Sequence, residues 1–136
     1  MATHVQKALR LRIYDLLVAD ATLATYVSTL IYSSAPDNTV YPRVKIGAQT
    51  LEDWSTHTTN GFQGDVFIHA WAQGTSDVEI MNIMNSIYAV LHAITDLQIS
   101  GYSTVNFRCV LNEILPEPDG RTYQGVQRYS IMLGGD

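Results

Sequence analysis

The chain has 136 residues, of which 46% are hydrophobic and 15% charged, and its formal net charge is −5. This length is typical of a single domain, here residues 1–136, with a core of its own. The charged share is below the usual figure of about 25%, which favours a protein whose surfaces are covered by other subunits. No lysine or arginine occurs between Lys45 and Arg108. A chain without a basic patch to hold phosphates is not expected to bind nucleic acid specifically.

Cysteine use and hydropathy indicate where the protein works. The single cysteine, Cys109, cannot form an internal disulfide, and no secretory leader is recognisable at the start of the chain. Polar residues interrupt every apolar segment before it reaches membrane-spanning length. We therefore expect a soluble protein of a reducing compartment, with no membrane partner.

The first 30 or so residues predict two helices. Apolar residues recur at three- and four-residue spacing, which is typical of an amphipathic helix with one buried face (Val5, Leu9, Ile13, Leu16 and Leu17). Asp20 is a suitable cap for a second, short helix that carries Leu23 and Val27.

From Val40 the apolar period changes to two, which predicts a strand. Val40, Val44, Ile46 and Ala48 are expected on one face of it. Pro42 has no N–H to donate, so this strand lies at a sheet edge or begins there. A polar connection is predicted over residues 51–61, and a second strand from about Phe62 to Ala72.

The second half of the chain predicts a helix followed by a hairpin. Ser76 and Glu79 have the spacing of a capping box, and the helix after them carries an apolar stripe (Ile80, Met84, Ile87, Leu91 and Ile94). Strands are predicted over residues 104–115 and 122–133, with Asp119-Gly120 in the turn. In the first of them an alternating set is expected on one face (Val105, Phe107, Cys109 and Leu111). The fold class predicted is α+β, with a mainly antiparallel sheet of about four strands and helices packed on one face.

No catalytic, metal or cofactor site is predicted. Ser76 follows a strand and opens a helix, but Val78 stands where a nucleophile elbow needs glycine. Asp65 and His69 share a strand face but lie about 13 Å apart at the usual strand rise, too far to bind one ion. His92 and Asp96 have helical i, i+4 spacing, and we expect a hydrogen-bonded pair there rather than a metal site.

The central strand has two unlike faces. One is small and aliphatic and can lie under a helix (Phe62, Gly64, Val66, Ile68 and Ala70). The other mixes aromatic and polar residues (Gln63, Asp65, Phe67, His69 and Trp71), a composition favoured at protein–protein contacts. The alternative is a second, partly covered sheet face within the same domain. The predicted contact residues are Phe67, His69 and Trp71, with Trp54 as an aromatic anchor in the preceding polar connection.

The order of these parts resembles a known family. The segments that carry the resemblance are Leu16-Leu17-Val18-Ala19-Asp20, Tyr41-Pro42-Arg43-Val44-Lys45-Ile46-Gly47, Gly64-Asp65-Val66-Phe67-Ile68-His69-Ala70-Trp71, Ile87-Tyr88-Ala89-Val90-Leu91 and Pro118-Asp119-Gly120-Arg121. They resemble the tail-completion, or tail-terminator, proteins of long-tailed bacteriophages and gene transfer agents.

The resemblance implies a homo-oligomeric ring, in this family typically a hexamer, at the neck of a virion or gene-transfer-agent particle assembled in the bacterial cytoplasm. Its implied partners are the tail tube protein and the head–tail connector or stopper protein. DNA would pass through the lumen without specific binding. The family implies no catalytic residue and no cofactor.

Acidic residues are expected at the lumen wall. Asp53, Asp65 and Asp77 lie in the stretch without bases and would repel DNA over a Debye length of about 8 Å. The alternative is that these acids only keep an outer wall soluble. Two other functions also stay open at this point. One is another neck component, such as a stopper or adaptor ring, and the other is a small cytoplasmic oligomeric enzyme or ligand-binding protein.

Overall fold

Four long strands form the frame of the protein. The computed structural model describes residues 2–27, 31–32, 42–54, 61–74, 76–92, 94–99 and 102–135. The strands are β2 (Arg43–Asp53), β3 (Gly61–Gln73), β4 (Tyr102–Pro116) and β5 (Thr122–Gly135), all paired antiparallel. A two-residue strand, β1 (Ile31–Tyr32), pairs parallel to β2, and the sheet order is β1-β2-β3-β5-β4.

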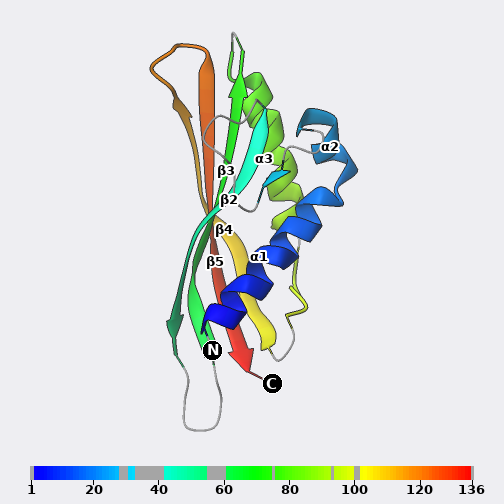
Figure 1. Ribbon diagram of the computed structural model, residues 1–136, viewed down its shortest axis with the longest axis vertical. Coiled ribbons are helices and arrows are strands. Elements are labelled where there is room, and N and C mark those ends of the chain that lie inside the picture. The colour runs from blue at the N-terminus through cyan, green and yellow to red at the C-terminus, as the bar shows by residue number, and fades with distance from the viewer. Residues whose placement is uncertain are drawn as a thin grey trace.

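The helices α1 (Ala2–Val18), α2 (Ala21–Val27) and α3 (Val78–Leu91) lie on one side of this sheet (Figure 1). The predicted α+β fold, with a mainly antiparallel sheet and helices on one face, is confirmed. The other face of the sheet has no helix among the described residues.

Helices α1 and α2 follow the predicted pattern. The apolar stripe of α1 is buried (Val5, Leu9, Ile13 and Leu17). The carboxylate of Asp20 accepts a hydrogen bond from the N–H of Leu23 at 2.8 Å, which confirms it as the cap of α2. Leu23 and Val27 of α2 are buried, as predicted.

Helix α3 begins differently from the prediction. Its N-cap residue is Asp77, which makes no side-chain capping hydrogen bond, so the predicted capping box is wrong. Ser76 precedes the cap position, and its hydroxyl is 3.5 Å from the N–H of Val78 rather than in reach of Glu79. The helix is held by its apolar face instead (Ile80, Ile83, Met84, Ile87 and Leu91). Ile94 lies beyond the helix end.

β-Bulges place some side chains on a different strand face from the one predicted. A register shift between Ile46 and Gln49 turns Ala48 to the surface, although Val44 and Ile46 are buried as predicted. Two shifts in β4, at Thr104/Asn106 and Cys109/Leu111, leave Val105 58% exposed and separate it from buried Phe107. Each bulge adds one residue, and one residue reverses the side to which the following side chains point.

Strand β2 also continues to Asp53, so the predicted polar connection starts later than residue 51. Val40 and residues 55–60 lie outside the described residues.

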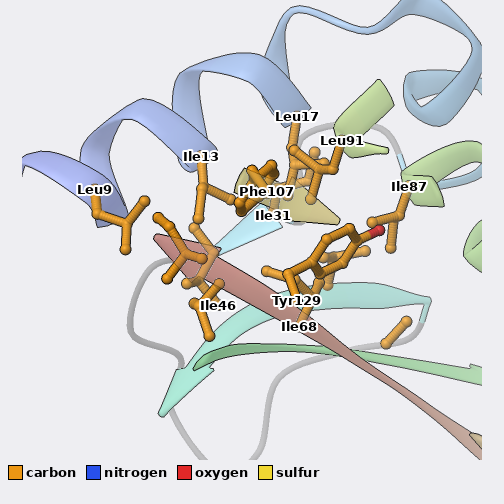
Figure 2. Packing of buried hydrophobic residues seen from close by; sticks show 14 of the residues in the cluster. Leu9, Ile13, Leu17, Ile31, Ile46, Ile68, Ile87, Leu91, Phe107 and Tyr129 are labelled. Carbon is orange, nitrogen blue, oxygen red and sulfur yellow. The ribbon is translucent and has the colours of Figure 1, made fainter. Parts of the chain in front are cut away.

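The core lies between α1, α3 and the sheet. Figure 2 shows Leu9, Ile13 and Leu17 of α1 directed at the strands, with Ile68 and Tyr129 beneath them. Tyr129 is fully buried, and burial raises the pKa of its hydroxyl above the ordinary value. Cys109 is half-buried and packs against this core, as expected for a core thiol.

A buried polar network crosses the core. The Tyr129 hydroxyl donates to Oε1 of Gln127 at 2.8 Å. Gln127 Nε2 in turn donates to the Met84 carbonyl at 3.0 Å and to Asn112 Oδ1 at 2.8 Å. The network therefore ties α3 to both strands of the β4–β5 hairpin.

Candidate contact surface

The side of the sheet that faces away from the helices is called the open face here. Its centre is the row of alternate β3 residues Phe67, His69 and Trp71, as predicted from the two unlike faces of this strand. The opposite row of β3 is buried beneath the helices (Val66, Ile68, Ala70 and Ala72). All three open-face residues are only partly covered by their own chain.

The rings of these three residues stack along the strand. The Phe67 and His69 rings have centroids 6.4 Å apart, and those of His69 and Trp71 are 5.7 Å apart, with interplanar angles of 19° and 18°. The guanidinium of Arg43, on neighbouring β2, lies 4.5 Å from the centroid of the Trp71 ring, within the range of a cation–π contact. The result is a flat aromatic ladder with a cation at one end.

His69 is neutral in this ladder. Burial, and after it the positive charge of Lys45, lower the pKa of His69 from its ordinary value. Its Nδ1 lies 3.2 Å from Gln124 Nε2. An amide NH2 can only donate, so Nδ1 accepts and the proton of the neutral ring is on Nε2. The imidazole acts here as an aromatic packing group rather than as a base.

Basic residues lie beside the ladder on both neighbouring strands, which the sequence pattern did not indicate. Lys45 pairs with His69 across β2 and β3, and Arg128 pairs with Phe67 across β3 and β5. A cleft of about 460 Å³ lies beside the ladder, lined partly by Arg10, Lys45 and Trp71. Strand β3, which contains no lysine or arginine, therefore has bases of the neighbouring strands beside it. Only strand pairing brings them there, so composition along the chain gave no signal of it.

Trp54 lies elsewhere. Its N–H donates to the Gly61 carbonyl at 3.0 Å, and its half-buried ring lies so close over Gly61 that a Cβ there would be 2.6 Å from Cε2 of the indole. Six residue steps along β3 lead from Gly61 to Phe67, the nearest of the three, which is roughly 20 Å at the usual rise. The structure therefore does not join Trp54 to the other three predicted contact residues.

The three predicted lumen acids lie at separate places. Asp53 is exposed at the end of β2. Asp65 is on the open face, 3.8 Å from Arg128 in an ion pair between two part-exposed side chains. Asp77 is the N-cap residue of α3, just beyond the opposite end of β3. The three acids do not form one cluster.

The remaining side chains that sequence analysis examined have structural partners. His92 Nδ1 accepts from the Cys109 N–H at 3.4 Å, and its ring stacks on Tyr88 with centroids 4.4 Å apart. Helix α3 ends at Leu91, so His92 and Asp96 do not have the helical spacing on which the predicted pair rested, and Asp96 accepts instead from the N–H of Gln98 at 2.9 Å. In the described part of the chain, no three potential ligands gather as a metal site would need. No described helix has the length and apolarity needed to cross a bilayer.

Comparisons with known proteins agree with the architecture. The family model described as "Tail completion protein gp17" matches residues 12–134. A chain in the "Virion of native gene transfer agent (GTA) particle" is similar in structure, with a TM-score of 0.85 and 22% identity over 96% of this chain and 98% of that one. The bacteriophage SPP1 gp17 protein is similar with a TM-score of 0.63 and 23% identity over 92% and 88% of the two chains. Comparison with the curated proteins finds no match.

Proposed function

Because the chain belongs to the tail completion protein gp17 family, we propose that it terminates a phage-type tail tube as a closed ring, typically of six copies. Membership of this family makes it a structural tail protein and not an enzyme. In the proposed ring, one end sits on the tail tube protein and stops its polymerisation. The other end receives the head–tail connector or stopper protein.

The observation that supports a ring is the open face. An antiparallel sheet covered by helices on one side can leave its other side to solvent, and that side then carries polar residues. Here that other side carries stacked Phe67, His69 and Trp71 instead of a row of solvated charges. Aromatic residues flanked by arginine are typical of contact surfaces between proteins. Repeated contacts of this kind between different patches of identical subunits close into a ring when the rotation between them is a fraction of a full turn.

We further propose that DNA passes through the lumen of the ring without specific binding. Glu52 and Asp53 end β2, and no base follows Lys45 in that strand. A wall built from this end would repel phosphates, whereas lysine or arginine contacts would retain them. Asp65 is paired with Arg128, so it would contribute less to such a wall than Asp53. The proposed place of the protein is the tail neck of a virion or gene-transfer-agent particle, after assembly in the bacterial cytoplasm.

Electron microscopy of tail tubes assembled with and without this protein tests the proposal. The tail tube protein from the same genome should polymerise into long tubes by itself. With this protein present, tubes should stop growing and carry a ring of extra density at one end. Density on the connector side of an assembled head, with tube length unchanged, would instead identify another neck component such as a stopper or adaptor ring.

A further inference from the structure

Helix α3 carries a second surface that its own chain leaves uncovered. Its outward stripe is exposed for about three turns and contains no charged residue (Val78, Met81, Asn82, Asn85 and Ala89). Val78 is 58% exposed and Met81 46%. A solvent-facing helix stripe normally carries charged residues. An uncharged stripe with exposed methionine and valine is typical of a contact surface.

A groove lies beside this α3 stripe. Met81, Met84, Asn85 and Tyr88 form one wall of a cavity of about 320 Å³, and residues of the β4–β5 hairpin, including Ile114, form the other. The groove is mostly lined by uncharged side chains. It would extend the area that a partner can cover on this side of the molecule.

The α3 stripe and the open face belong to different sides of the sheet. Helix α3 lies with the other helices on the covered face (Figure 1) and packs there through Ile80, Ile83 and Ile87. The aromatic ladder alternates with the buried row of β3 and so lies on the opposite face. One molecule therefore presents two unlike uncovered surfaces in different directions. A ring with head-to-tail contacts requires two such surfaces, because each copy gives one and receives the other.

The charges at the two surfaces are complementary. Lys45 lies at the aromatic ladder, and Arg10 lines the cleft next to it. Arg43 is only 8% exposed and lies on the Trp71 ring, so it is not counted among these charges. Asp77 and Glu79 stand at the start of the α3 stripe. Arg121 is near that end, since its carbonyl accepts from the Gly74 N–H at 2.8 Å. The adjacent acids Glu117 and Asp119 leave this end with more negative than positive charge.

We infer that, in the ring proposed above, the α3 stripe of one copy of this chain docks on the open face of the next copy, with Asp77 and Glu79 against Lys45 and Arg10. The neighbour's helix then packs on the uncovered face of the sheet, and a helix layer on a sheet is a stable arrangement. The aromatic ladder is the flat apolar platform, and Met81 is the adaptable side chain that packs on it. This inference assigns Asp77 to the subunit contact rather than to the lumen wall.

The test is the oligomeric state of the full-length protein, measured by mass photometry alone and with tail tubes, together with negative-stain images. Met81→Asp and Trp71→Ala each place a change at one of the two surfaces. Each should lower the ring fraction about tenfold at fixed concentration, as expected for loss of a central contact residue. Leu11→Asp is the matched control, because Leu11 is 50% exposed but lies on α1, outside both surfaces; it should assemble like the wild type. Thermal unfolding of each variant shows whether it is folded.

A charge exchange identifies the partner surface. Lys45→Glu and Glu79→Lys should each weaken ring formation, and the double variant should recover most of it, because opposite charges face each other again. The outcomes separate the two proposals. If the wild type forms no ring even on tail tubes, the ring function itself fails. If rings form and folded Met81→Asp and Trp71→Ala assemble as well as wild type, the ring stands and the α3 docking is wrong. A double variant that assembles no better than either single charge variant would also count against the docking.

Discussion

The ring of His69 lies against the ring of Trp71 on the open face of β3, with centroids 5.7 Å apart and planes at 18°. The same imidazole accepts a hydrogen bond from Gln124 on β5. Two strands thus hold one neutral histidine in an aromatic stack, and its protonation should weaken the folded state.

We predict a stability that falls on acidification through His69. The pKa of His69 is lowered in the folded protein, whereas in the unfolded chain it is near 6.5, the usual reference. Between these two pKa values the unfolded state binds the proton and the folded state does not, so the free energy of unfolding decreases as pH falls below about 6.5. Urea unfolding at several pH values checks this.

The control for that experiment is His69→Gln, which keeps a polar side chain but cannot titrate. The difference in free energy of unfolding between wild type and variant should change with pH only below about 6.5. A difference that is the same at every pH from 5 to 8 would contradict the assignment of the slope to His69.

Gly64 is predicted to be intolerant of any side chain. A Cβ at this position would overlap the carbonyl of Thr50 on the neighbouring strand, and backbone of paired strands cannot move without breaking hydrogen bonds. We expect Gly64→Ala to destabilise the protein by about 3 kcal/mol. Gly134→Ala is the matched control, since its Cβ would meet Val105 at an ordinary 3.5 Å. Equal melting temperatures for the two variants would show that β2 and β3 are not so closely paired.

The hydroxyl of Tyr129 should contribute to stability through Gln127. Tyr129→Phe removes the donor to Gln127 Oε1 and leaves a buried acceptor without this partner, which costs about 1–2 kcal/mol. The phenyl ring still stacks on Phe107, 5.3 Å away, so the fold should persist. Denaturant unfolding measures the change. Tyr26→Phe, at a half-buried position of α2, is the control and should change stability little.

Trp54 is predicted to act at the tail tube rather than between subunits, because Gly61, which its ring contacts, lies roughly 20 Å along β3 from Phe67, the nearest residue of the aromatic ladder. We expect Trp54→Ala to lower attachment of the protein to tail tubes about tenfold while rings still form. Cosedimentation with preformed tubes measures attachment. Glu52→Ala, two residues earlier and exposed, should attach normally. Unchanged attachment of a folded Trp54→Ala variant would remove Trp54 from this role.

Much of the fold was predictable because its elements obey local rules. The apolar stripe of α1, the Asp20 cap and the two faces of β3 each follow from a period of 3.6 or 2 over a few residues. The faces of β4 were not predictable in the same way. Its bulges depend on which residue of β5 lies opposite, and a single added residue reverses the pattern for Val105. The capping box was wrong because Asp77, and not Ser76, takes the N-cap position of α3.

The amino-acid sequence by itself determined the fold class, the aromatic row on β3 and the resemblance to tail completion proteins. Each of these rests on patterns that lie within short segments of the chain. The tertiary structure alone decided what surrounds that row. Antiparallel pairing places Lys45 beside His69 and Arg128 beside Phe67, so a segment without a single base lies between two strands that carry bases. Register across a sheet joins residues that are tens of positions apart, and no local pattern records which of them will meet.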